Sequence, residues 1–211
     1  TLVMRDTRDA IAVASKVIAA HDVPEPEVML EVEVLEVSHD RLSNLGIKFP
    51  DSAQVTEGAA MLPLNGAGVR TRLFFRVYVG ALYLTKKTTA ANALINDTGA
   101  KRIALYMLRE LSSDQFVSAL EDGLKNNHPA EQLAKLDAPT RQLRVIFDAV
   151  KTAKTGDVIF IDYLPGAGTR ITVNGAVRGT IPGEDFNRAL LRIWLGDSPA
   201  DSDLKKGMLG G

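Results

Sequence analysis

Residues 64–84, LNGAGVRTRLFFRVYVGALYL, join a glycine-rich half to a half rich in aromatic and β-branched side chains. The second half predicts a long strand from Leu73 to Leu84, because such side chains favour strands. In the first half the pattern Leu-x-Gly-Ala-Gly-x-Arg occupies residues 64–70, and it returns at residues 164–170. Neither copy has the glycine spacing or the Lys-Ser/Thr ending of a phosphate-binding loop. We therefore expect a turn at each copy rather than a nucleotide site.

The sequence that follows this stretch alternates between strand and helix signals. Helices are expected from Ser112 to about Asn126, from Asp137 to Thr152, and after Pro182-Gly183. Further strands are expected at residues 102–108, 157–163, 170–173 and 176–180. Strands joined in hairpins, with helices grouped between them, predict an α+β fold in which a layer of helices covers an antiparallel sheet.

The first fifty residues differ in composition from the rest of the chain. They hold five basic and nine acidic side chains, a net charge of −4, which leaves +3 for the other 161 residues. Only one of the 17 glycines lies there. A short strand, a helix ended by Pro24 and Pro26, and an alternating strand from Val28 to Val34 are predicted. We therefore divide the chain into a small β-α-β segment, residues 1–50, and a main domain, residues 51–211.

The composition of the whole chain is that of a soluble globular protein. It is 45% hydrophobic and 24% charged, with no cysteine and a net charge of −1. This argues against a disordered chain, a disulfide scaffold and a basic nucleic-acid binder. No apolar run is long enough for a membrane-spanning helix. The histidines are isolated at His21, His39 and His128, so we expect no metal site. No cofactor is expected either.

Residues 1–50 resemble a fragment of the bacterial secretins. The resemblance rests on Val3-Met4-Arg5-Asp6-Thr7, the helix after them, and Pro24-Glu25-Pro26-Glu27-Val28 leading into Leu30-Glu31-Val32-Glu33-Val34. The similar stretch of a secretin is the end of the last periplasmic ring-forming module. The resemblance implies oligomerisation through residues 1–50 and no pore, because the barrel-forming part of a secretin is not included.

The main domain carries a second resemblance. The stretch at residues 64–84, followed by GTIPGEDFNRALLRIWLGDSPADSDLKKGMLG at residues 179–210, is similar to the bacterial chalcone-isomerase-like family. The similarity spans about Gly46 to Gly211 and implies the fold of that family. Both resemblances imply a periplasmic or cell-envelope location. Plant chalcone isomerases close a ring without a cofactor, which requires a cation for the phenolate and hydrogen-bond donors for the enolate oxygen.

The second resemblance assigns candidate site residues one by one. The arginine of the family's Gly-Ala-Gly-x-Arg motif falls on Arg70, and the threonine of the next strand falls on Tyr78. The catalytic tyrosine at the start of the long helix falls on Phe116, and the asparagine seven residues later falls on Gly123. Two hydrogen-bonding groups are thus missing, so no residue is assigned a catalytic role. If the protein is an isomerase, Arg70 and Tyr78 are its candidates.

Related plant proteins that bind fatty acids are more similar at these positions. They pair the same arginine with a tyrosine in a Val-Tyr sequence of the following strand, here Arg70 and Tyr78. The resemblance implies that these two residues bind the carboxylate of a fatty acid or a similar apolar ligand. The lining of the cavity is expected from Leu73, Phe75, Leu105, Met107, Phe116 and Leu120.

Three alternatives stay open from the sequence. Arg70 could pair with a buried carboxylate such as Asp162, with Tyr78 as ordinary strand packing. The chain could be an intramolecular lyase that acts on an enone. It could also act in assembly of the cell envelope through residues 1–50.

Overall fold

A computed structural model describes residues 47–56 and 59–211 of the chain. The predicted β-α-β segment therefore lies outside the described residues, except for its last four positions. Its resemblance to secretins and its role in oligomerisation stay predictions. The main domain is the part in which the sequence-based expectations can be compared with the structure.

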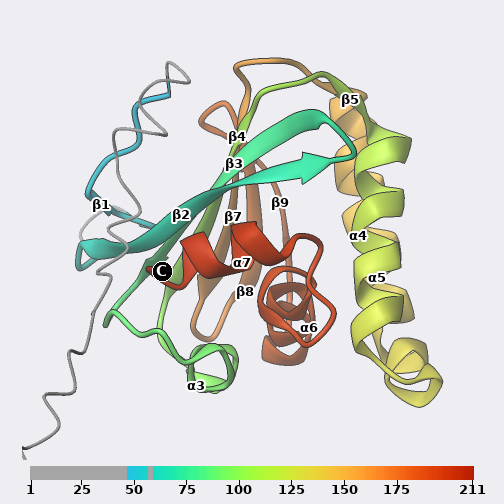
Figure 1. The fold of residues 1–211 in the computed structure, drawn as a ribbon. Coiled ribbons are helices and arrows are strands. Elements are labelled where there is room, and N and C mark those ends of the chain that lie inside the picture. The colour runs from blue at the N-terminus through green and yellow to red at the C-terminus, as the bar shows by residue number, and fades with distance from the viewer. Residues whose placement is uncertain (1–46, 57–58) are drawn as a thin grey trace, which may run out of the picture. The chain divides into compact units, whose positions relative to one another are not determined.

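The main domain is built on a seven-stranded sheet in which every neighbouring pair is antiparallel (Figure 1). The order of the strands is β1 (Ser52–Ala53), β2 (Leu62–Arg72), β3 (Phe75–Leu84), β4 (Lys101–Met107), β7 (Val158–Leu164), β8 (Gly168–Val173) and β9 (Ala176–Ile181). Two short strands, β5 (Leu111–Ser112) and β6 (Thr152–Ala153), pair separately. The predicted α+β class and antiparallel sheet are confirmed.

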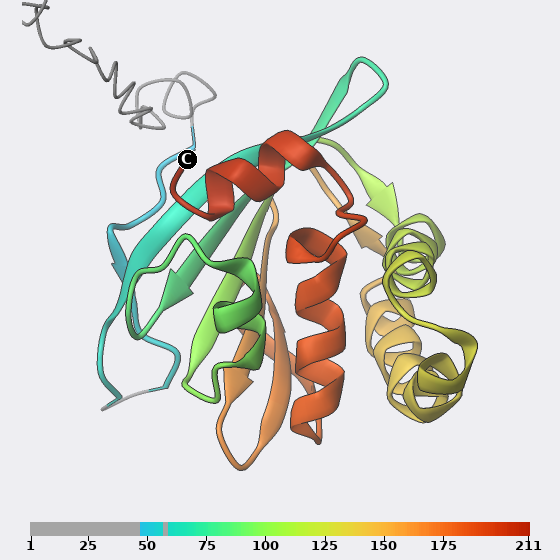
Figure 2. The ribbon, with the colours of Figure 1, turned by 60° about the horizontal axis from the view of Figure 1, so that its bottom comes forward.

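Helices form a layer over one face of this sheet (Figures 1 and 2). They are α3 (Ala91–Asn96), α4 (Ser113–Asn127), α5 (Ala130–Val150), α6 (Glu184–Leu195) and α7 (Ser202–Met208). Helix α6 contacts β8 and α4, whereas α7 contacts β2 and β3. A capping box fixes the start of α4, since the Ser112 hydroxyl accepts from the Gln115 amide and the Gln115 side chain accepts from the Ser112 amide. No helix in residues 47–56 and 59–211 is long and apolar enough to cross a membrane.

Each face of the sheet carries its own hydrophobic cluster, because alternate residues of a strand point to opposite faces. In β3, Leu82 and Leu84 join the larger cluster beneath the helices. Ala81 and Tyr83 join the smaller cluster on the other face, which also includes Leu62. The helix-covered face therefore supplies most of the core, and it is the face on which the candidate site lies.

The glycine-rich copy at residues 64–70 is part of strand β2, so the expected turn there is wrong. The reason is the approach of α7. A side chain at Gly66 would overlap the backbone oxygen of Gly207, and only glycine leaves room for so close a contact. The second copy does form a turn, with Gly166 at φ 79° between β7 and β8. The two copies share a sequence pattern for different physical reasons.

Two further elements depart from the sequence-based prediction. Helix α5 begins at Ala130, seven residues before the expected start, and continues through Pro139. Its buried residues Leu136, Leu143 and Phe147 are spaced at helical intervals on both sides of the proline, so packing outweighs the lost backbone hydrogen bond. Leu73 was expected inside a strand, but it occupies the turn between β2 and β3 with φ 56°.

Candidate functional site

Arg70 and Tyr78 face each other across the β2–β3 pair, where they are register partners. An Nη of Arg70 lies 3.4 Å from the Tyr78 hydroxyl oxygen, to which it donates. The guanidinium carbon lies 5.5 Å from the centre of the tyrosine ring, within the range of a cation–π contact. The structure therefore brings together the two residues that the sequence assigned to the anion anchor.

Trp194 of α6 completes this group from the helix layer. Its indole Nε1 donates to the Tyr78 hydroxyl oxygen over 2.8 Å, and the Tyr78 side chain is only 1% exposed. Burial raises the pKa of the Tyr78 phenol above its usual 10.0, although the Arg70 charge and the two hydrogen bonds act in the opposite direction. The phenol is therefore neutral at physiological pH and keeps a proton that it can donate.

Arg70 has an unusual environment for a half-buried cation. Within the part of the chain that the structure describes, no carboxylate lies at ion-pairing distance from its guanidinium. Its Nε is buried and has no hydrogen-bond acceptor among these residues. Asp201 is the N-cap of α7, and its carboxylate accepts from the backbone amides of Thr71, Asp203 and Leu204. A buried cationic donor of this kind favours a negatively charged partner.

The alternative in which Arg70 pairs with Asp162 is wrong. Asp162 is fully buried and accepts two hydrogen bonds from Arg102, at 2.6 and 2.8 Å, and one from Arg170 at 3.0 Å. The three residues are register partners on adjacent strands. Arg102 also stacks on the Phe160 ring, with its guanidinium carbon 4.0 Å from the ring centre. The carboxylate is thus already neutralised by two arginines of β4 and β8.

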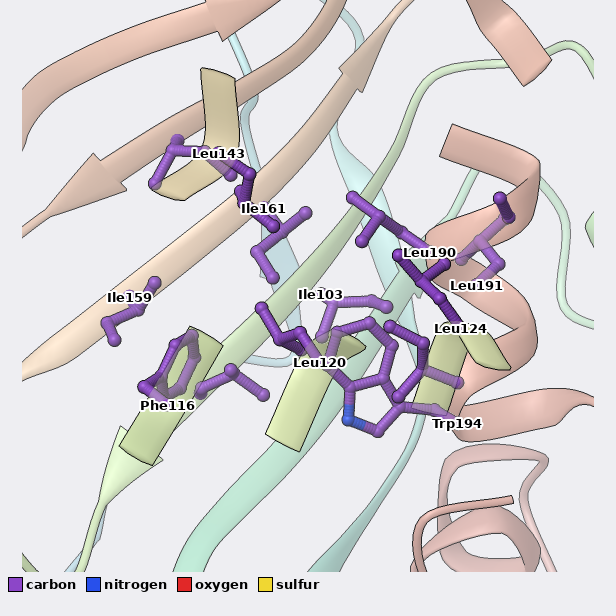
Figure 3. Close-up of a cluster of buried hydrophobic side chains, with 14 of the residues drawn as sticks. Ile103, Phe116, Leu120, Leu124, Leu143, Ile159, Ile161, Leu190, Leu191 and Trp194 are labelled. Carbon is purple, nitrogen blue, oxygen red and sulfur yellow. The ribbon is translucent and has the colours of Figure 1, made fainter. Parts of the chain in front are cut away.

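The expected apolar lining divides into a buried and an exposed group. Phe116 of α4 is buried in the larger cluster, 4.6 Å from Phe147 between ring centres. Figure 3 shows it among side chains of the sheet and of α4, α5 and α6, Trp194 included. The other buried members are Leu105, Met107 and Leu120.

Leu73 and Phe75 do not line this interior, contrary to the expectation for both. They lie at the β2–β3 turn, and the side chain of Phe75 is 54% exposed. The cause is the register, which pairs Arg72 with Phe75 and so leaves Leu73 and Phe74 as the turn. The Phe75 ring is instead covered on one side by Arg109, whose guanidinium carbon is 4.3 Å from the ring centre.

Gly123, the position on which the resemblance places the isomerase asparagine, lies where α4 and α6 pack closely. A Cβ at this position of α4 would lie 2.6 Å from Ile193 of α6, so glycine permits the two helices to approach. An asparagine would not fit without displacing α6. Phe116, on which the resemblance places the isomerase tyrosine, is surrounded by apolar side chains and has no hydroxyl to donate.

Within residues 47–56 and 59–211, no group of three or more potential metal-ligating side chains lies together.

A sequence model of the family described as chalcone isomerase-like matches residues 41–210. The chain belongs to the chalcone isomerase-like family. A crystal structure of a fatty-acid binding protein of Arabidopsis thaliana has a similar fold, with a TM-score of 0.63 over 79% of this chain and 93% of the plant chain. The two sequences are 16% identical. No curated protein matches the chain in sequence.

The sequence analysis did not identify Trp194 of this chalcone isomerase-like protein as part of the site. The indole N–H is the signal that could have indicated it, because a buried tryptophan usually finds an acceptor. The acceptor proves to be Tyr78, 116 positions earlier in the chain. Only the packing of α6 on the sheet brings the two together.

Proposed function

We propose that this chalcone isomerase-like protein binds a fatty acid or a similar apolar carboxylate, with Arg70 and Tyr78 on the carboxylate. The carrying observation is the buried Nε of Arg70, which has no acceptor in the described part of the chain, beside the neutral phenol of Tyr78. A guanidinium can donate two parallel hydrogen bonds to a carboxylate, and the phenol can add a third. The solved structure with the same fold, described as that of a fatty-acid binding protein, supports this choice of ligand.

The apolar part of such a ligand would lie against the larger hydrophobic cluster. Tyr78, Phe116 and Trp194 all belong to this cluster, and each is at most 4% exposed. Because these side chains are packed, an acyl chain can enter only if α4 or α6 moves away from the sheet. Binding would then exchange contacts between helices and sheet for contacts with the ligand.

Binding of a fluorescent fatty-acid analogue by the full chain tests the proposal. Loss of a charge-assisted hydrogen bond costs about 1.5–3 kcal/mol, so we expect Arg70→Ala to raise Kd by about 10-fold to 100-fold. Tyr78→Phe removes a neutral donor and should have a smaller effect. Arg178→Ala, at an exposed position of β9, serves as the matched control and should bind like the wild type. Equal binding by Arg70→Ala and wild type would overturn the anchor assignment.

A further inference from the structure

The turn between β2 and β3 exposes three consecutive large apolar side chains, which we call the hairpin tip: Leu73, Phe74 and Phe75. They are 82%, 95% and 54% exposed, respectively. Figure 2 shows the β2–β3 turn projecting beyond the neighbouring strands and the helix layer. Isolated exposed apolar residues are ordinary, but a contiguous group on a projecting turn indicates a surface that is covered by something else.

Three arginines, which we call the arginine collar, surround the hairpin tip: Arg72, Arg76 and Arg109. All three are exposed. Arg72 and Arg76 flank the turn, and Arg109 stacks on Phe75. In residues 47–56 and 59–211, none of the three forms an ion pair with a carboxylate. The tip therefore combines apolar side chains with three cationic side chains that form no ion pair among the described residues.

The backbone at the turn adds an independent observation. Leu73 has φ 56°, a left-handed conformation that glycine or asparagine adopts at much lower cost than a large side chain. A leucine here does not help the turn to form, and its side chain is almost fully exposed to solvent. Both facts indicate that the leucine side chain serves a contact outside the main domain.

We propose that the hairpin tip inserts into the interface of an anionic lipid bilayer. The three apolar side chains would enter the boundary between headgroups and acyl chains, and the arginines would remain at the level of the anionic headgroups. A second copy of the chain fits less well. A symmetric contact through the same tip would bring two arginine collars together, and three side chains bury too little area for a stable dimer.

The position of the tip relates this surface to the candidate site. From the Arg70–Tyr78 pair the register continues with Thr71–Arg76 and Arg72–Phe75, which ends at the turn. A docked tip would therefore hold Arg70 close to the lipid surface, where a fatty acid resides. The lipid contact itself requires only the tip and the collar, so it does not depend on ligand binding at Arg70.

Insertion can be measured with a tryptophan placed on the tip of the full chain. We expect Phe74→Trp to show a blue-shifted emission with vesicles that contain phosphatidylglycerol, and quenching when their lipids carry bromine atoms in the acyl chains. Val145→Trp, at a 69% exposed position of α5, is the matched control and should show neither change. The wild type supplies the background of Trp194, which is buried. Equal quenching of the two variants, or quenching of neither, would overturn the proposal.

Vesicle co-sedimentation separates the apolar and the charged contributions. We expect Phe74→Ser to weaken binding at least about tenfold, and Arg72→Gln or Arg76→Gln about fivefold each. Val145→Ser and Arg178→Gln should bind like the wild type, and all proteins should bind poorly to phosphatidylcholine alone. Arg70→Ala should keep its vesicle binding even if it loses the fatty acid, which distinguishes the two proposals. A dimer that Phe74→Ser abolishes, without vesicle binding by the wild type, would identify a second copy as the occupant and overturn the lipid proposal.

Discussion

The Tyr78 phenol is held between a cation and an indole donor, and its buried environment couples folding to pH. Because burial raises its pKa above 10.0, the folded protein keeps a proton that the unfolded chain releases at alkaline pH. The stability that this phenol contributes is therefore complete below pH 10 and is lost as the pH rises toward the pKa of the folded state.

Tyr78→Phe removes this titration. We expect the free energy of unfolding of the wild type to fall more steeply above pH 10 than that of Tyr78→Phe, by up to about 1.4 kcal/mol per pH unit. Urea unfolding of both proteins between pH 8 and pH 11 measures the difference in slope. The loss of two hydrogen bonds lowers the stability of the variant at every pH, and this offset does not affect the slope. Parallel curves would contradict the assignment of a raised pKa to Tyr78.

At the same scale, the resemblance predicted that Arg70 and Tyr78 act together, and the structure places them in contact, but their surroundings were not predicted. The two residues lie on adjacent strands of one hairpin, so their contact is nearly local. The partners of Asp162 are set by strand order, since β4 and β8 flank β7 although β4 lies some 60 positions earlier. No pattern in a single sequence records which strands become neighbours across such a distance, and for this reason the alternative of an Arg70–Asp162 pair stayed open from the sequence.

Among the secondary-structure elements, α4 and α6 are joined at an unusually close contact. Gly123→Ala would place a Cβ 2.6 Å from the Ile193 side chain. Alanine favours an isolated helix over glycine by about 1 kcal/mol, but overpacking in a core costs about 1–3 kcal/mol. We therefore expect Gly123→Ala to lower the free energy of unfolding, as measured by urea denaturation.

A double variant tests the physical cause of this effect. Ile193→Ala alone removes buried methyl groups and should be destabilising. In that background Gly123→Ala should cost little or should stabilise, because the clashing atoms are gone. Additive effects of the two substitutions would show that the helices do not meet as the structure has them.

Periodic elements were predictable from the sequence, and glycine-rich or proline-containing elements were not. Helices α4 and α6 have regular apolar spacing, and both were located to within a few residues. Strand β2 looked like a turn because its glycines are needed for the approach of α7, which is itself a tertiary contact. The early start of α5 was missed because a proline is tolerated in the first turn of a helix but not in its interior, so Pro139 favours a start near Asp137. Packing of α5 against α4 and β9 compensates for the interior proline.

Across the whole main domain, the two faces of the sheet have separate cores, and only one of them contains the candidate site. Arg70, Tyr78 and Trp194 contact the larger cluster under the helices, while Leu62 belongs to the smaller cluster on the opposite face. Substitutions should therefore be able to change stability and the proposed ligand binding independently. A residue removed from the small cluster should affect folding alone, whereas one removed beside the site should affect both.

Phe116→Ala and Leu62→Ala test this separation, because each replaces a buried apolar side chain on a different face. Both should lower the free energy of unfolding, by about 3–5 kcal/mol for the phenylalanine and about 2–5 kcal/mol for the leucine. In Phe116→Ala the space left under α4 can accept part of an acyl chain without movement of the helix. A fatty acid at a fixed concentration should therefore raise its Tm by more than that of the wild type, since tighter binding to the folded state gives greater stabilisation. In Leu62→Ala the fatty acid should raise the Tm by as much as in the wild type. If the fatty acid raises the Tm of the wild type, Phe116→Ala and Leu62→Ala equally, the acyl chain does not lie beside Phe116.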